Sequence, residues 1–123
     1  MPELPEVETA RRAAHRHLAG RRILKVAAVA DPIVLDRVSP GRLSRALRGR
    51  RVVGVRRRGK HMWVELDRRP WPVLHFGMTG SFALSRDGDP RPRFWKMEIA
   101  VEGGRRLVLA DSRRFGRVRL QQD

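Results

Sequence analysis

The 123-residue chain contains no cysteine, and acidic residues are few beside the basic ones. The lack of cysteine excludes disulfide bonds, zinc fingers with cysteine ligands, iron–sulfur clusters and cysteine nucleophiles within these residues. The chain also has no apolar run of about 18 residues, so we expect no membrane-spanning segment. Early acids and prolines stand where a signal peptide needs a basic start and an apolar run, which predicts an intracellular protein.

The balance of charge is strongly positive. Lysine and arginine number 28 against 13 aspartate and glutamate residues, a formal net charge of +15. This excess favours a polyanionic partner, of which nucleic acid is the simplest. The alternative is a soluble domain whose arginines reflect biased codon usage. Hydrophobic residues make up 41% of the chain, enough for a core. The length fits one domain, and no repeat or long linker divides it.

Two helices are predicted. The first runs from Pro5 to about Leu18, because proline suits the first helical turn and apolar residues recur on one face. Gly20 is a suitable stop for it. The second covers Pro40 to Leu47, with Ser39 as the N-cap and Gly49 beyond its end.

Most of the remaining chain is predicted to form strands, since short apolar runs alternate with Gly, Pro and Asp. The residues Gly103-Gly104 predict a hairpin turn between two of them. These elements indicate a mainly β fold with flanking helices, either a flattened barrel or, as we favour, a two-layer β-sandwich of about eight strands. The predicted strands are Ile23–Val29, Val52–Arg58, His61–Leu66, Val73–Phe76, Ser81–Leu84, Lys96–Val101, Leu107–Ala110 and Gly116–Leu120.

The N-terminus offers a nucleophile. Removal of Met1 before the small residue Pro2 exposes a secondary amine, whose pKa of roughly 7.7–8.0 leaves part of it neutral at neutral pH. Its attack on an aldehyde carbon gives an iminium, an electron sink that favours elimination. Glu3 and Glu6 lie close by as candidate proton donors. The plain alternatives are a common Met-Pro start without a role and acids that serve the helix dipole.

Four segments together are more specific than these parts. Residues 1–9, Met-Pro-Glu-Leu-Pro-Glu-Val-Glu-Thr, resemble the start of the formamidopyrimidine-DNA glycosylase/endonuclease VIII (Fpg/Nei) family. Residues 57–61, Arg-Arg-Gly-Lys-His, resemble its basic hairpin with a catalytic lysine. Residues 75–81, His-Phe-Gly-Met-Thr-Gly-Ser, and 111–116, Asp-Ser-Arg-Arg-Phe-Gly, resemble two further loops of the family. Their order and rough spacing agree across the chain.

The resemblance implies a set of catalytic residues. A damaged base is flipped from duplex DNA into a pocket, because chemistry on a stacked base is out of reach. Pro2 would then attack C1′ of the deoxyribose and displace the base. Glu3 would act as the acid that opens the sugar ring, Glu6 would support the site by hydrogen bonding, and Lys60 would contact a phosphate and assist proton transfer. β,δ-Elimination would cut the strand on both sides of the sugar.

It also implies DNA contacts. Met78, Arg113 and Phe115 match the residues that fill the space left by the flipped base, a set that favours oxidised purines. Core packing is the alternative for Met78 and Phe115. His75 is a candidate phosphate contact by resemblance, and Arg114 belongs to a wider group of basic residues expected to include phosphate contacts. The group is Arg56, Arg57, Arg58, Arg114, Arg117 and Arg119.

The sequence also departs from the family pattern. Phe94-Trp95-Lys96 stands where the family has a DNA-contacting histidine, and Ser112 replaces a proline. Residues 59–67 look more like the plant and fungal branch. The family's helix–two-turn–helix and zinc-finger domains are absent, so we expect residues 1–123 to be an N-terminal catalytic domain. The four histidines show no metal-ligand spacing, and we assign no metal or other cofactor to this chain.

The sequence therefore predicts a bifunctional DNA glycosylase and abasic-site lyase of base excision repair, acting on oxidised purines such as 8-oxoguanine and formamidopyrimidine. The expected partner is damaged double-stranded DNA. We expect an intracellular monomer associated with DNA, in the cytoplasm or nucleoid of a bacterium or in the nucleus of a eukaryote. One alternative is a non-catalytic DNA-binding module of the same fold, inactive for lack of the C-terminal domains. A second, a small RNA-binding protein, gives no reason for the combination of Pro2, Glu3, Glu6 and Lys60.

Overall fold

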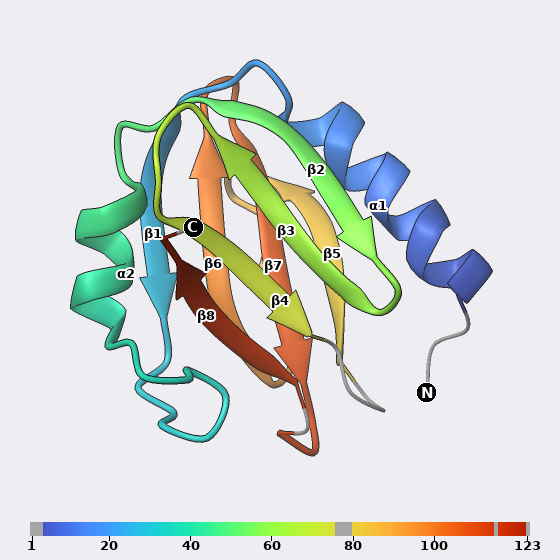
Figure 1. Cartoon of the computed structure of the whole chain (residues 1–123), viewed down its shortest axis with the longest axis vertical. Helices are drawn as coiled ribbons and strands as arrows, with labels where there is room; N and C mark the ends of the chain where they lie inside the picture. Colours follow the sequence, from blue (N-terminus) through green and yellow to red (C-terminus); the bar gives the residue numbers. More distant parts are fainter. Residues whose placement is uncertain (1–3, 76–79, 115, 123) are drawn as a thin grey trace.

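The computed structural model describes residues 4–75, 80–114 and 116–122. Within them the chain forms two helices and two four-stranded antiparallel sheets, which face each other as a sandwich (Figure 1). The predicted two-layer β-sandwich with flanking helices is confirmed. The elements are α1 (Leu4–Leu18), β1 (Ile23–Ala28), α2 (Pro40–Leu47), β2 (Val52–Arg58), β3 (His61–Leu66), β4 (Trp71–His75), β5 (Gly80–Arg86), β6 (Trp95–Val101), β7 (Arg105–Asp111) and β8 (Arg117–Gln121).

Both sheets combine early and late parts of the chain. The first has the strand order β1-β6-β7-β5, and the second has the order β2-β3-β4-β8. Along the chain, the sheet changes between β1 and β2, between β4 and β5, and between β7 and β8. Helix α1 packs against β2, and α2 packs against β1 on the other side. The turn between β2 and β3, the end of β4 and the segment between β7 and β8 carry residues of the predicted site.

The helix boundaries follow the local signals in the sequence. The hydroxyl of Ser39 accepts a hydrogen bond from the backbone N–H of Arg42 at 3.1 Å, so the predicted N-cap of α2 is confirmed. Gly20 has a φ of +80°, a conformation that favours glycine just after a helix. Neither helix within the described residues is long and apolar enough to cross a membrane.

The core lies between the two sheets and under both helices. Val7, Ala14 and Leu18 face it from α1, and Leu43 and Leu47 face it from α2. Because these positions recur at helical spacing, burial of one face holds each helix on the sandwich. The largest fully buried strand residues are Ile23, Val52, Met62, Leu74, Met97, Ile99, Leu107 and Leu109.

Strand β4 begins two residues earlier than predicted and contains Pro72. Proline has no N–H to give to a sheet, which argues against a position between two paired strands. The structure resolves this because the pairing of β3 with β4 ends at Val73, so Pro72 pairs only with Leu120 of β8. The predicted end of this strand, Phe76, lies outside the described residues.

The hairpin of β6 and β7 turns at Gly103-Gly104, as predicted, with φ values of +85° and +71°. The hairpin also buries a carboxylate, that of Glu98, which is 2% exposed. Burial opposes ionisation of Glu98, but hydrogen bonds from Arg91 at 3.1 Å and Arg106 at 2.6 Å outweigh it and lower the pKa of this carboxyl. The two guanidinium groups thus keep the buried charge paired.

Candidate nucleic-acid interface

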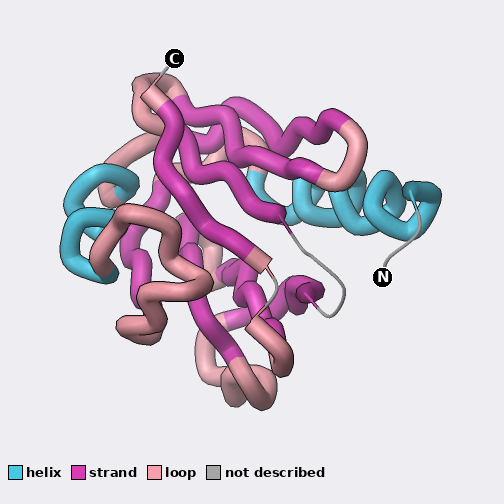
Figure 2. The backbone as a smooth tube through the Cα atoms, turned by 60° about the horizontal axis from the view of Figure 1, so that its bottom comes forward, coloured by secondary structure: helices cyan, strands magenta, loops and turns pink. Residues whose placement is uncertain are grey.

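Five predicted functional residues lie in the described part of the chain. Lys60 is in the turn between β2 and β3, His75 ends β4, Arg113 and Arg114 are in the loop from β7 to β8, and Glu6 is in the first turn of α1. These segments lie toward the same end of the sandwich (Figures 1 and 2). The other predicted residues, Pro2, Glu3, Met78 and Phe115, lie outside the described residues.

In the second sheet, strand pairing places basic side chains from β2, β3, β4 and β8 side by side in one row. Arg58 of β2 pairs with His61 of β3, His61 pairs with His75 of β4, and His75 pairs with Arg117 of β8. Directly paired residues of antiparallel strands place their side chains on the same face. We call these four residues the basic row, and Lys60 lies in the turn beside it.

The surroundings of His75 disfavour its charged form. Its ring lies 4.6 Å from that of His61, measured between centroids. Partial burial lowers the pKa of His75, and the charges of His61, Arg117 and Lys60 lower it further. The imidazole is therefore neutral at neutral pH, and its N–H can donate a hydrogen bond to a phosphate oxygen without adding a charge of its own.

Helix α1 is tied to the β2–β3 hairpin by Glu8. This carboxylate accepts hydrogen bonds from Arg57 at 2.8 Å and from Arg11 and Arg12 of its own helix at 2.8–2.9 Å. The bond from Arg11, followed by that from Arg57, holds the pKa of Glu8 well below its usual range. Glu6 lies on the exposed part of the first turn, two residues before this anchor. The anchor sets the helix start beside the hairpin that carries Lys60.

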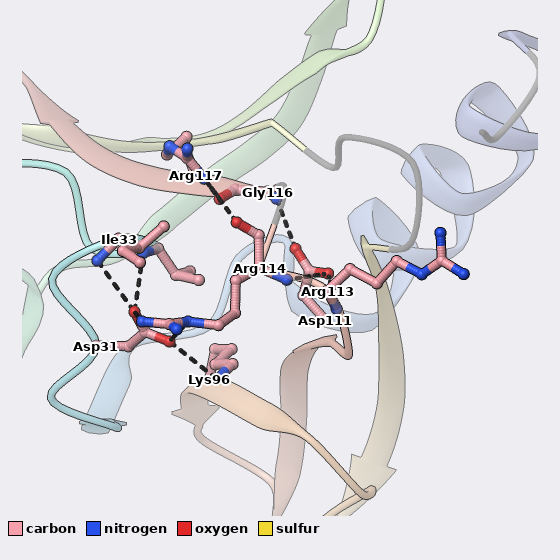
Figure 3. A network of polar contacts seen from close by, with 9 residues as sticks. Asp31, Ile33, Lys96, Asp111, Arg113, Arg114, Gly116 and Arg117 are labelled. Atoms are coloured by element: carbon pink, nitrogen blue, oxygen red, sulfur yellow. Dashed lines mark hydrogen bonds and ion pairs between the residues drawn. The ribbon is translucent and has the colours of Figure 1, made fainter.

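The loop after β7 is shaped by the buried carboxylate of Asp111. One oxygen accepts the backbone N–H groups of Arg113 at 3.2 Å and Arg114 at 3.1 Å, and the other accepts that of Gly116 (Figure 3). This arrangement is an Asx-type turn, in which a side chain satisfies the backbone in place of secondary structure. It accommodates Arg114 at a φ of +61°.

A second carboxylate, Asp31, holds the side chain of Arg114. The guanidinium donates two hydrogen bonds of 2.9 Å to the two oxygens of Asp31, and Lys96 donates a third at 3.0 Å (Figure 3). The backbone N–H groups of Ile33 and Val34 also point to this carboxylate. The Arg114 bonds hold the pKa of Asp31 well below its usual range against the opposing effect of burial. We call Asp31, Lys96 and Arg114 the Asp31 clamp.

The two arginines of this loop have different environments. The guanidinium of Arg114 is bound to Asp31 within the clamp, whereas the exposed side chain of Arg113 extends away from the clamp (Figure 3). Within the described residues, no hydrogen bond or ion pair of the Arg113 guanidinium is found. Arg113 is therefore available to an external partner, and the clamp holds the backbone that presents it. The predicted DNA contacts of Arg113 and Arg114 stay predictions.

Sequence reasoning missed Glu8 and Asp31 as organising residues. Glu8 carries the i, i+3 and i, i+4 spacing to Arg11 and Arg12 that signals helical ion pairs, but its bond to Arg57 joins residues 49 apart. Asp31 contacts Lys96 and Arg114, which are 65 and 83 residues away in the sequence, so no local sequence pattern indicates these contacts. Three or more His, Cys, Asp or Glu residues placed to bind a metal ion are not found in the described ranges.

Residues 1–118 match the protein family described as "Formamidopyrimidine-DNA glycosylase N-terminal domain". The chain belongs to this family. Among relatives named formamidopyrimidine-DNA glycosylase, one from Acidothermus cellulolyticus is 43% identical over 119 residues, covering 94% of this chain and 42% of the relative. One from Arabidopsis thaliana is 35% identical over 133 residues, covering 98% and 34%.

Solved structures of the Fpg family share the fold. The Lactococcus lactis protein in complex with DNA containing Fapy-dG superposes with a TM-score of 0.86 at 29% identity, covering 97% of this chain and 44% of that one. The same protein with DNA containing an oxidised pyrimidine gives a TM-score of 0.86 at 30% identity, with the same coverage. The chain thus spans about two fifths of the length of the Fpg relatives it matches.

Proposed function

We propose that this chain is the N-terminal catalytic domain of a bifunctional DNA glycosylase and abasic-site lyase of base excision repair. Its substrate is damaged duplex DNA, on which it acts inside the cell as a monomer, and its own residues need no metal or cofactor. The observation that carries the proposal is the place of Lys60 beside the basic row that includes His75, in the hairpin that Glu8 ties to helix α1. The exposed Arg113 lies in the loop that leads into β8. Membership of the Fpg family supports the same chemistry.

The proposed chemistry begins at the amine of Pro2 after removal of Met1. The nitrogen forms a bond to C1′ of the deoxyribose, and the bond from C1′ to the damaged base breaks. Glu3 donates a proton to the ring oxygen, the sugar opens, and an iminium joins Pro2 to C1′. Glu6 supports the site by hydrogen bonding. The iminium then acidifies C2′, so that loss of the two phosphates by β- and δ-elimination follows.

Lys60 is proposed to contact the phosphate next to the lesion and to assist proton transfer. Its place in the turn beside the basic row supports this, because a phosphate there meets several positive groups. The Glu8 anchor holds the first turns of α1 beside this hairpin, which supports a role in the same reaction for the residues that precede the helix. The neutral imidazole of His75 is proposed as a further phosphate contact.

Arg113, with Met78 and Phe115, is proposed to fill the space left by the flipped base. Unstacking a base costs a few kcal/mol, and a side chain in the vacated space recovers part of this cost. The exposed Arg113 on its braced loop supports the assignment. Oxidised purines are the proposed lesions, supported by the complex of the L. lactis relative with Fapy-dG DNA. Oxidised pyrimidines are the competing substrate, because that relative is also described with one.

Borohydride trapping tests the proposal. The protein, with loss of Met1 verified by mass, is incubated with a duplex that contains one abasic site, and borohydride is added. Hydride transfer to the iminium carbon gives a stable amine, so we expect a cross-linked protein–DNA band on a denaturing gel. The matched control is the same chain with a short tag before Met1, in which the nitrogen of Pro2 is an amide and cannot form the iminium.

Loss of the band in the tagged protein, with tight duplex binding retained, would support Pro2 as the nucleophile. A band of equal strength in both proteins would point to a lysine amine instead and contradict the assignment. No band from the mature protein, together with duplex binding, would favour the alternative of a non-catalytic DNA-binding module that lacks the remaining domains. Release of the base from duplexes with 8-oxoguanine and with an oxidised pyrimidine then separates the two substrate classes.

A further inference from the structure

The outer face of the second sheet carries aromatic and basic side chains beyond the basic row. Arg56, Trp63, Val73 and Arg119 are paired in turn across β2, β3, β4 and β8, and therefore share one face with the basic row. One step further along, Trp71 pairs with Gln121. This face thus presents the half-buried ring of Trp63 in one row with Arg56 and Arg119, and Trp71, which also packs against the core, lies one step beyond.

This face is hollowed. A cavity of about 560 Å³ opens on it, a volume within the range of small-molecule sites. A smaller one of about 210 Å³ shares His61, Val73 and Arg119 with it and continues to His75 and Arg117. The larger cavity is lined by Arg58, His61, Trp63, Arg69, Trp71, Val73, Arg119 and Gln121.

The charges of the larger cavity are of one sign. Three guanidinium groups line it, those of Arg58, Arg69 and Arg119, and no carboxylate does so among the described residues. The guanidinium of Arg69 lies 3.5 Å above the ring of Trp71, and Arg119 is held by the side chain of Gln121. Two of the three cations are therefore held in place before any ligand arrives. The smaller cavity adds one carboxylate, that of Asp36.

We propose that this outer face binds a segment of single-stranded DNA. Arginines along a groove suit successive phosphates, and an indole offers a stacking surface to a base of any sequence. The half-buried ring of Trp63 lies between Arg56 and Val73 in its row, and is the stacking surface. A single strand fits a hollow of this size, whereas a duplex presents its phosphates without exposed base faces.

The groove lies next to the proposed site of the repair reaction. It starts at the basic row, which adjoins Lys60, and runs along β4 and β8 toward Trp71 and Gln121. The inference goes beyond the proposed glycosylase function, and it does not require that function, because binding of a lesion-free strand involves no covalent step.

Intrinsic fluorescence provides the first measurement. The chain has three tryptophans, and Trp95 lies on the other sheet. In a Trp95→Phe background both remaining indoles line the cavity, so a lesion-free oligothymidylate that stacks there is expected to quench the emission. Saturating oligothymidylate that binds, by anisotropy of a labelled strand, without changing this emission would place the strand elsewhere and overturn the proposal.

Matched variants give the second measurement. Trp63→Ala is expected to weaken binding of oligothymidylate about tenfold, from loss of one base stack. Arg119→Ala is expected to weaken it several-fold and to reduce the slope of log affinity against log salt by about 0.7, the value for one single-strand phosphate. The control Arg42→Ala removes the same charge from the exposed surface of α2 and should change neither quantity.

Equal affinities for Arg119→Ala and Arg42→Ala would show that only overall charge matters and would overturn the proposal. Thermal melting establishes that each variant is folded. If Trp63→Ala is not folded, Arg69→Ala takes its place, since Arg69 lines the same cavity. The borohydride experiment fails or succeeds independently, because the oligothymidylate has no abasic site and forms no iminium.

Discussion

Among single residues, His75 shows how the fold changes the pKa of a side chain, which the sequence alone does not reveal. It stands between His61 and Arg117 in the basic row, and Lys60 is near enough to act on its charge. These neighbours attract phosphate, yet they also disfavour the imidazolium. The row thus concentrates positive charge while keeping its central imidazole neutral, and an arriving phosphate offsets part of the neighbouring positive charge.

We predict that the pKa of His75 lies below its ordinary value of 6.5 in the free protein and rises when duplex DNA binds. The folded state favours the neutral ring, so the stability linked to His75 is present above pH 6.5 and is lost as the pH falls through the lower, folded pKa. Titration of the ring protons by NMR measures both values. Arg117→Ala should raise the pKa and Arg42→Ala should leave it unchanged. A pKa above 6.5 in the free protein would contradict the prediction.

Among the secondary-structure elements and loops, the loop from β7 to β8 is held by two carboxylates, one of which binds its backbone and the other a side chain. Asp111 shapes the backbone of the loop, and Asp31 holds the side chain of Arg114. Asp31 follows β1 and Lys96 is on β6, so the clamp fastens the crossing loop to the first sheet just before β8 enters the second. The exposed Arg113 is then presented from a braced segment.

We predict that Asp31→Asn lowers the free energy of unfolding by about 2 kcal/mol at pH 7, because Arg114 and Lys96 lose their charged partner. The depressed pKa of Asp31 means that its contribution is present above the ordinary value of 3.8 and is lost as the pH falls through the folded pKa. The difference between the two proteins should therefore shrink below about pH 4. Chemical denaturation across this range measures it.

The matched control is Asp36→Asn. Asp36 is more exposed than Asp31, and its ion pair with the almost fully exposed Arg37 is 4.0 Å long. Pairs of this kind contribute little, so the control should change stability by less than about 0.5 kcal/mol. An Asp31→Asn protein as stable as this control at pH 7 would show that the clamp does not brace the loop.

At the scale of the whole molecule, charge opposes folding and favours binding. A formal net charge of +15 on 123 residues creates repulsion in the compact state, and the same field attracts the phosphates of nucleic acid. Several arginines are already paired internally with Glu8, Asp31 or Glu98, so the remaining exposed ones dominate the external field.

We predict that salt acts on the two properties in opposite directions. Raising sodium chloride from about 0.05 M to 0.3 M screens the repulsion and should raise the melting temperature. The same change should weaken duplex binding, with a slope of log affinity against log salt of about −0.9 for each phosphate neutralised. Calorimetry and fluorescence anisotropy measure these effects. A duplex affinity that does not depend on salt would show that the basic row makes no phosphate contacts.

Much of the fold was predictable because its signals are local. Ser39 before Pro40 marks a helix start, and Gly103-Gly104 marks a hairpin, each within a few residues. Pro72 misled the strand boundary because its tolerance depends on where the neighbouring strand stops pairing. Asp31 was missed because its partners are distant in the chain. Of the predicted site, Lys60 lies beside the basic row that contains His75, and Arg113 is exposed in the loop before β8, while their roles stay predictions.

The strand order has a consequence for the protein during its synthesis. The first sheet needs β6 and β7 between β1 and β5, and the second needs β8 beside β4. Neither layer is complete until the last fifth of these residues has left the ribosome. Until then β4 presents an unpaired edge to its surroundings, and unpaired edges invite association with other chains. The nascent chain must therefore be shielded, or must outpace aggregation, while the segment between β4 and β8 is synthesised.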